Sequence, residues 1–266
     1  MGAPLREWLL WTLLTVAFVA LVAAIALSPV TWPWRAGILC VIGAILFDQA
    51  FRRLPTFDPL LRVRSRLPRA SADRTCALTF DDGPCAATAD VLDILAAERV
   101  PATFFVLGGS IARHPALVQR AFAEGHDIAL HGEDHRKLGG ADLATVEHQV
   151  AGLTRRLVDL GVTPAPLYRT PHGHKSASVF AVARAHGLTL WGWTRGVWDT
   201  ERPDAAVLVR RCTRAARSGM VLLLHDGRGD EPTPDIGSVV AALPAIVREL
   251  KRRGFTFIRL SDATGR

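Results

Sequence analysis

Short apolar runs alternate with longer amphipathic stretches from Cys76 to the end of this 266-residue chain. Seven runs have the length and composition of buried strands, and the six stretches between them have helical spacing. Strands that alternate with helices predict a parallel sheet, either open or closed into a barrel. The expected strands are 76–80, 102–106, 127–131, 166–170, 188–193, 220–225 and 255–260, and the expected helices are 88–98, 110–124, 142–160, 176–186, 204–217 and 236–253.

The N-terminal part of the chain has a different character, because it begins with a long uncharged stretch. Trp8–Leu27 contains 20 residues, and a helix of that length can cross the hydrocarbon core of a bilayer. A cleaved signal peptide is the alternative, although its apolar region is normally shorter. A second apolar stretch follows at 30–47, interrupted by Pro33 and Arg35. We expect a transmembrane helical hairpin within residues 1–51, with one span and an interfacial helix as the alternative.

Positive charge gathers beside this apolar region. Of the net charge of +7, residues 1–75 contribute +5 and the rest of the chain +2. This distribution is typical of a segment that contacts anionic membrane lipids, and it argues against a nucleic-acid partner. We interpret 52–74 as a basic juxtamembrane linker and 75–266 as the folded domain. Because positive segments tend to remain inside, we expect the bacterial inner membrane with the domain facing the cytoplasm, the extracytoplasmic face being the alternative.

The four cysteines are far apart and form no C-x-x-C pair, so a thiolate zinc site is not expected. Free thiols suit a reducing compartment. The alternative is a single disulfide between Cys76 and Cys85, which are close in sequence.

Polar residues cluster at the carboxyl ends of the expected strands, which is the edge where parallel α/β folds place their ligands and reactive groups. Each of five strands contributes at least one such residue. They are Asp81, Asp82, His131, Arg169, Asp199 and His225.

Two of these positions have the composition of a metal site. Asp81 and Asp82 are adjacent where a strand ends, so their carboxylates can point in different directions and serve different purposes. His131 and His135 are four residues apart, and two imidazoles with one carboxylate form a common site for a catalytic divalent ion. Taken singly, the acidic pair is also typical of an ordinary turn, and the histidine pair also occurs by chance.

Two further residues suit proton chemistry and its support. His225 ends a strongly apolar strand and suits a general acid if a carboxylate such as Asp199 orients it and raises its pKa. Arg169 could orient a carboxylate such as Asp81. The alternatives are a hydrogen-bonded histidine at the sheet edge and an ordinary ion pair.

Taken together, these residues resemble the polysaccharide deacetylases of carbohydrate esterase family four, which include the nodulation-type chitooligosaccharide deacetylases. The resemblance covers about residues 75–262 and rests on five motifs in the family's order. They are T-F-D-D-G-P at 79–84, H-x-x-x-H at 131–135, R-x-P-x-G at 169–173, an aromatic segment that ends in Asp at 193–199, and L-x-H at 223–225. The family resemblance implies an irregular (β/α)7 barrel, here preceded by the membrane hairpin.

The resemblance also implies roles for individual residues. Asp82, His131 and His135 would bind Zn²⁺, or Co²⁺, Ni²⁺ or Mn²⁺ in the same site. Asp81 would be the general base and His225 the general acid, with Arg169 and Asp199 supporting them. The residues expected around the substrate and its oxyanion are Pro171, His172, Trp193, Trp198 and Leu223; Trp193 could equally be part of the core.

We therefore expect a metal-dependent hydrolase that removes N-acetyl groups from an amino-sugar glycan or glycolipid, held to membrane lipids by its N-terminus, with no protein partner evident. The alternatives are a deformylase or another non-peptide C–N amide hydrolase acting on a lipid-linked amino sugar, and an inactive glycan-binding barrel. Gly132, His172 and Thr200 depart from the residues usual in the family, so chitin or peptidoglycan specificity does not follow from the motifs.

Overall fold

The computed structural model describes residues 32–53, 63–68, 74–229 and 231–263. It divides into two compact units, Met1–Phe51 and Arg52–Arg266, which are considered separately.

Within the first unit, the described part is one helix, α2 (Trp32–Arg53), of 22 residues. It covers residues 32–47 of the second stretch expected to span a membrane, and Arg35 and Asp48 interrupt its apolar sequence. Among the described residues, no helix combines the length and apolar character needed to cross a bilayer. The first expected span, Trp8–Leu27, lies outside the described residues. The predicted transmembrane hairpin is therefore unsupported by the described helices.

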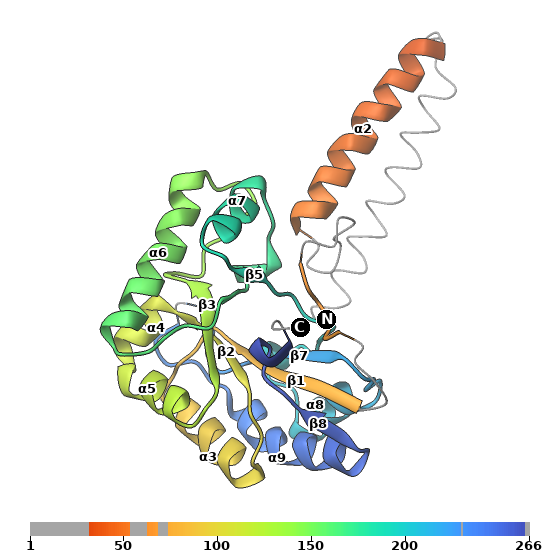
Figure 1. The fold of residues 1–266 in the computed structure, drawn as a ribbon. Coiled ribbons are helices and arrows are strands. Elements are labelled where there is room, and N and C mark those ends of the chain that lie inside the picture. The colour runs from red at the N-terminus through yellow and green to blue at the C-terminus, as the bar shows by residue number, and fades with distance from the viewer. Residues whose placement is uncertain (1–31, 54–62, 69–73, 230, 264–266) are drawn as a thin grey trace. The chain divides into compact units, whose positions relative to one another are not determined.

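The second unit is built around a parallel sheet in the order β5-β4-β3-β2-β1-β7-β6, with β8 paired to the start of β1 (Figure 1). Its arrangement is that of a half-barrel of alternating strands and helices, which agrees with the expected (β/α)7 fold in its coarser form. The strands are β1 (Arg74–Asp81), β2 (Thr103–Leu107), β3 (Asp127–Gly132), β4 (Leu167–Tyr168), β5 (Thr189–Leu190), β6 (Arg195–Gly196), β7 (Met220–His225) and β8 (Phe255–Phe257).

Helices cover the outer face of the sheet, as Figure 1 shows. They pack against it through one apolar side, because residues three or four apart share a helix face. The helices are α3 (Thr88–Glu98), α4 (Gly108–Arg113), α5 (Pro115–Ala123), α6 (Leu143–Asp159), α7 (Ala177–Ala185), α8 (Ala205–Thr213) and α9 (Gly237–Arg252), with short 3₁₀ turns η1 (Pro171–Gly173), η2 (Asp199–Glu201) and η3 (Ser261–Ala263).

Two details differ from the sequence-based expectation. The helix expected at 110–124 is two helices, because Pro115 lacks an N–H and begins a new helix at its first position. The pair Arg195–Gly196 forms a strand, β6, that was not expected, since two residues carry too little periodicity to be recognised.

Part of the segment expected as a linker takes part in the barrel. The Arg64 N–H donates to the Leu190 carbonyl at 2.9 Å, and the Leu67 N–H donates to the Gly219 carbonyl at 2.9 Å. Leu67 is buried in the inner core. Residues 63–67 thus connect β5, at one end of the sheet, with β7, next to the strand at the other end.

The inner face of the sheet positions the polar residues. Ala77, Phe105, Ala129, Leu167 and Val221 belong to one buried inner cluster. Because strand side chains alternate with period two, the residues two or four positions further along share this inward direction. Those residues include Asp81, His131, Arg169 and His225. The polar site therefore lies at the carboxyl ends of the strands, next to the apolar inner cluster and inside the same barrel.

Candidate active site

The carboxylate of Asp82 lies between two imidazoles. Its Oδ1 is 3.1 Å from His131 Nε2 and 3.1 Å from His135 Nε2. The three ligand atoms lie within 4.8 Å of one another. Asp82 follows strand β1 with a φ of 73°, which turns its side chain away from the direction of Asp81. The adjacent carboxylates consequently face different partners.

The hydrogen bonds around this trio leave its ligand atoms directed inward. His131 Nδ1 lies 2.7 Å from the Arg169 carbonyl oxygen, so this nitrogen carries the proton and donates, and Nε2 presents a lone pair. The Gly229 N–H donates to Asp82 Oδ2 at 2.9 Å. Asp82 Oδ1 is buried and accepts no hydrogen bond from the described residues. One carboxylate oxygen and two imidazole nitrogens that converge in this way fit a divalent metal ion.

The charges of the trio are mutually stabilising. Burial opposes ionisation of Asp82, but the adjacent imidazoles of His131 and His135 outweigh it and hold the pKa of the carboxyl well below its usual value. Burial also opposes protonation of His135, and Asp82 outweighs it and raises the pKa of that imidazole. Asp82 is therefore ionised at neutral pH, as a metal ligand must be.

A buried arginine holds the second carboxylate. Arg169 Nη1 lies 2.7 Å from Asp81 Oδ1, and both side chains are almost fully buried. The guanidinium also donates to Thr79 Oγ1 and to the Gly192 carbonyl, and it lies 4.1 Å from the centre of the Phe105 ring. Burial lowers the pKa of Arg169. Its N–H donors are nevertheless satisfied by the acceptors around it. The other Asp81 oxygen, Oδ2, is 3.9 Å from His131 Nε2, so it faces the trio.

On the opposite side, a carboxylate orients the last residue of β7. His225 Nδ1 lies 3.0 Å from Asp199 Oδ1, and the His225 backbone N–H donates to Asp199 Oδ2 at 2.8 Å. Burial lowers the basicity of His225, but Asp199 outweighs it and raises the pKa of the imidazole to about 9. The Nε2 edge of a protonated His225 is thus available as a proton donor at neutral pH.

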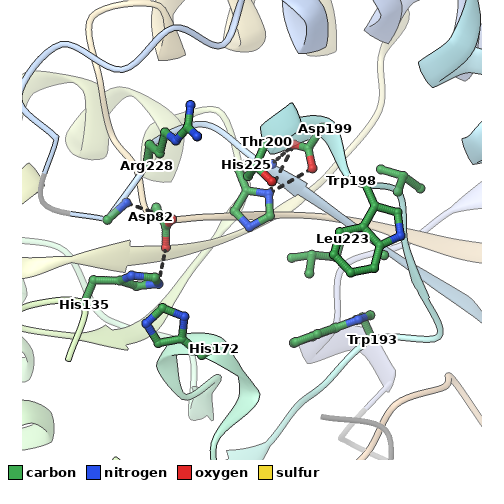
Figure 2. A pocket seen from close by; sticks show the side chains of 13 residues that line it. Asp82, His135, His172, Trp193, Trp198, Asp199, Thr200, Leu223, His225 and Arg228 are labelled. Carbon is green, nitrogen blue, oxygen red and sulfur yellow. Dashed lines mark hydrogen bonds and ion pairs between the residues drawn. The ribbon is translucent and has the colours of Figure 1, made fainter. Parts of the chain in front are cut away.

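Several of these groups line a cavity of 510 Å³. Figure 2 shows Asp82, His135 and His172 on one side of it and Trp193, Trp198 and Leu223 on the other, with the His225 ring between them. Asp81, His131 and Arg169 do not line this cavity; they are buried among the inner groups.

Comparison with known proteins identifies the family. The sequence model described as polysaccharide deacetylase matches residues 69–191. A chitooligosaccharide deacetylase of Bradyrhizobium sp. (strain ANU 289) is 36% identical over 209 residues, covering 75% of this chain and 94% of that protein. This chain belongs to the polysaccharide deacetylase family.

Other members of the polysaccharide deacetylase family agree with this assignment. A peptidoglycan-N-acetylglucosamine deacetylase of Bacillus cereus is 33% identical over 193 residues, which cover 71% of this chain and 88% of that protein. The crystal structure of the Bc1960 peptidoglycan N-acetylglucosamine deacetylase superposes with a TM-score of 0.70 at 26% identity, covering 76% of this chain and 92% of that one. The expected family and the enzyme class, a polysaccharide N-deacetylase, are confirmed.

The structure brings together most of the residues singled out from the sequence. His172 has a φ of 57° in η1, and its ring centre lies 4.3 Å from that of His135. Burial lowers the pKa of His172 to about 4, so its ring is neutral at neutral pH. Pro171 is buried and does not line the cavity. Trp191 is 1% exposed and belongs to the inner core.

Sequence reasoning missed the loop after β7. Gly229 supplies the N–H that binds Asp82, and Arg228 lines the cavity. A Cβ at Gly227 would lie 2.3 Å from the Asp82 carbonyl oxygen, so only glycine allows this loop to approach. The two glycines shortly after His225 were the available signal, since such residues often mark a close backbone approach.

Proposed function

We propose that this polysaccharide deacetylase hydrolyses the N-acetyl group of an amino sugar, in a glycan or lipid-linked glycan, with Zn²⁺ or a similar divalent ion in its site. The observation that carries the proposal is the buried Asp82 oxygen that lies 3.1 Å from two imidazole nitrogens. Asp82, His131 and His135 would hold the ion. When bound, a divalent ion would supply Lewis acidity, which polarises a carbonyl and makes water more acidic.

Asp81 is assigned as the general base of this reaction. Arg169 holds one of its oxygens and leaves Oδ2 directed toward the metal-binding trio. The carboxylate can therefore receive the proton of a water molecule that attacks the acetyl carbon. Because the arginine is buried and bonded to four acceptors, it keeps the carboxylate in this orientation.

His225 is assigned as the general acid. An amide nitrogen leaves readily only as an amine, so the departing nitrogen needs a proton. The Asp199 carboxylate raises the pKa of His225 to about 9, which keeps the imidazole protonated at neutral pH. Because Nδ1 is bonded to Asp199, Nε2 is the nitrogen that can donate its proton to the substrate. We assign stabilisation of the oxyanion to the backbone N–H of His172, in the turn beside the trio.

The walls of the cavity suit a sugar ring. Trp198 is half exposed and Trp193 lines the same cavity, and aromatic faces stack on the apolar faces of pyranose rings. Leu223 adds an apolar surface between them. His172 places a neutral imidazole against His135, where it can exchange hydrogen bonds with substrate hydroxyls.

We further propose that the N-terminal region attaches the enzyme to the bacterial inner membrane. Two features support this: the uncharged sequence Trp8–Leu27 and the large exposed apolar side chains of α2. Those side chains are Trp32, Trp34, Ile38, Val41, Ile45 and Leu46. Lipid attachment would place a lipid-linked amino sugar within reach of the catalytic domain.

The decisive experiment measures acetate release from three acceptors: a chitooligosaccharide, a peptidoglycan fragment and a lipid-linked N-acetylated amino sugar. Mass spectrometry of the acceptor should show loss of an acetyl group, a chelator should abolish the reaction, and Zn²⁺ or Co²⁺ should restore it. Full turnover by protein that elemental analysis shows to be metal-free would contradict the proposed mechanism. Turnover of an N-formyl acceptor alone would instead support a deformylase.

Two isosteric variants separate the roles of the adjacent carboxylates. Asp81→Asn should retain the metal and lose roughly 10²- to 10⁴-fold in kcat, the usual contribution of a general base. Asp82→Asn should lose both the metal and turnover. Asp93→Asn, which alters a surface carboxylate paired with Arg120, is the matched control and should change neither. Equal metal loss in the Asp81 and Asp82 variants would show that the roles are divided wrongly.

A further inference from the structure

The segment that carries both histidines of the trio is fastened to helix α6 through its backbone. The N–H groups of Glu133 and Asp134 both donate to Gln149 Oε1, at 2.9 and 3.2 Å. Gln149 lies in α6 and is fully buried. One side-chain oxygen therefore holds two successive peptide groups between His131 and His135.

The glycine beside His131 is explained by the same amide. Gly132 has a φ of 117°, and a Cβ built there would lie 2.8 Å from Gln149 Oε1. Any other residue would be strained by its backbone conformation and would also push the glutamine oxygen away. The departure from the family pattern at Gly132 and the position of Gln149 thus belong to one arrangement.

The side chain of Glu133 completes the attachment. A Cβ at Gly108 or at Gly152 would lie 2.0 or 2.7 Å from a Glu133 carboxylate oxygen, so glycine at both positions makes room for this carboxylate. Arg156 of α6 pairs with it at 3.2 Å, and the Glu133 carbonyl accepts from the Gly109 N–H at 3.0 Å. The segment is thus anchored to both α4 and α6.

We propose that Gln149 is a positioning residue that sets the spacing of His131 and His135 and thereby the affinity and geometry of the metal site. This inference rests on the proposed metal-dependent function. Its physical basis is that strand β3 holds His131, whereas His135 follows the strand in residues 133–135, where no helix or strand ladder fixes the second imidazole. Supporting hydrogen bonds around a metal site typically contribute 10- to 100-fold in affinity.

The test uses Co²⁺ as the probe, because its visible absorption spectrum reports coordination geometry. Co²⁺ is titrated into the metal-free full chain as wild type, Gln149→Met and Gln149→Leu, and thermal unfolding of each protein is recorded. Both substitutions place an apolar side chain of similar size at this position and remove the amide oxygen that accepts from the two backbone donors. We expect the Kd for Co²⁺ to rise by about tenfold or more and the spectrum to change in shape.

Leu153→Ala is the matched control for loss of stability. Leu153 is buried in the same helix and belongs to the hydrophobic core, so its truncation weakens the packing of α6 without removing the amide. It should lower the unfolding temperature but leave the Co²⁺ spectrum and Kd close to wild type.

The outcomes separate the inference from the function on which it rests. Wild-type protein that binds no Co²⁺ contradicts the metal-dependent function and this inference together. Wild-type binding that both Gln149 variants match contradicts the inference alone. An equal rise in Kd and the same spectral change in Leu153→Ala also overturn it, because stability of α6 and not the amide would then determine the site.

Discussion

Individual residues in this site act in pairs whose members come from distant parts of the chain. Arg169 holds Asp81 on one side of the trio that is proposed to bind the metal, and Asp199 holds His225 on the other. In each pair, one atom of the supported residue, Asp81 or His225, remains directed inward. The two supports differ in charge: the cation Arg169 holds a carboxylate, whereas the anion Asp199 favours the protonated form of His225. These supports agree with the proposed roles of Asp81 as the general base and His225 as the general acid.

The pH dependence of turnover should report the second pair. The Asp199 carboxylate raises the pKa of His225 to about 9, so the acidic form is present at neutral pH and is lost as pH rises through that value. We expect kcat/KM to fall on the alkaline side accordingly. In Asp199→Asn the charge is removed while burial still lowers the pKa, so this alkaline limb should move to lower pH.

The matched control for this measurement is Glu201→Gln. Glu201 lies in the same turn as Asp199 but pairs with Arg211, so the profile of this variant should coincide with that of wild type. An alkaline limb that stays in place in Asp199→Asn would show that His225 is not the titrating acid.

At the scale of elements, the ends of helices and strands matter more than their middles. Strand β1 ends at the acidic pair, and the turn η1 between β4 and α7 carries His172. Residues 174–176 join this turn to helix α7, whose N-cap Ser176 accepts a hydrogen bond from the Val179 N–H at 3.3 Å. A helix cap of this kind satisfies a backbone donor that has no partner within the helix.

Ser176→Ala should therefore destabilise the catalytic domain. Loss of a serine N-cap typically costs about 1 kcal/mol, and Ser176 is buried. The free energy of unfolding, measured by urea denaturation of the full chain, should fall by about that amount. Ser178→Ala, two positions further along the same helix, should change it by less than about 0.5 kcal/mol. Equal effects of the two substitutions would assign the loss to the helix in general and not to its cap.

At the scale of the whole molecule, a barrel with a nearly balanced charge follows a basic, apolar N-terminal region. The small net charge of the barrel is compatible with an uncharged glycan substrate. The positive charge of the N-terminal region is compatible with anionic lipid headgroups. The distribution of arginine about the apolar stretches places most of the positive charge on their C-terminal side, which favours a cytoplasmic position for that side.

A pair of fusions tests this topology. A fluorescent protein fused to the C-terminus should fluoresce in membrane fractions, and an alkaline phosphatase fused at the same position should be inactive, because that enzyme needs an oxidising compartment for its disulfides. A fluorescent fusion that stays dark together with an active phosphatase would place the domain outside. Fluorescence in the soluble fraction alone would contradict the membrane attachment.

The alternation of apolar runs was enough to predict the fold class and the location of the polar edge. These strands are continuous apolar runs that are buried on both faces, so their ends can be located from local sequence and Asp81, His131 and His225 assigned to their carboxyl ends. Such predictions succeed because they depend on neighbours within a few residues.

Only the tertiary structure decided which distant groups complete the site. Gln149 resembles any polar residue of an amphipathic helix, yet folding buries it against the backbone between His131 and His135. The Gly229 N–H reaches Asp82 from the loop after β7, 147 positions along the chain. Residues 63–67 bind to β5 and β7, although they belong to a segment that the sequence indicates only as a linker. These contacts join parts of the chain that local periodicity cannot relate, because their partners are chosen by how the strands and helices pack.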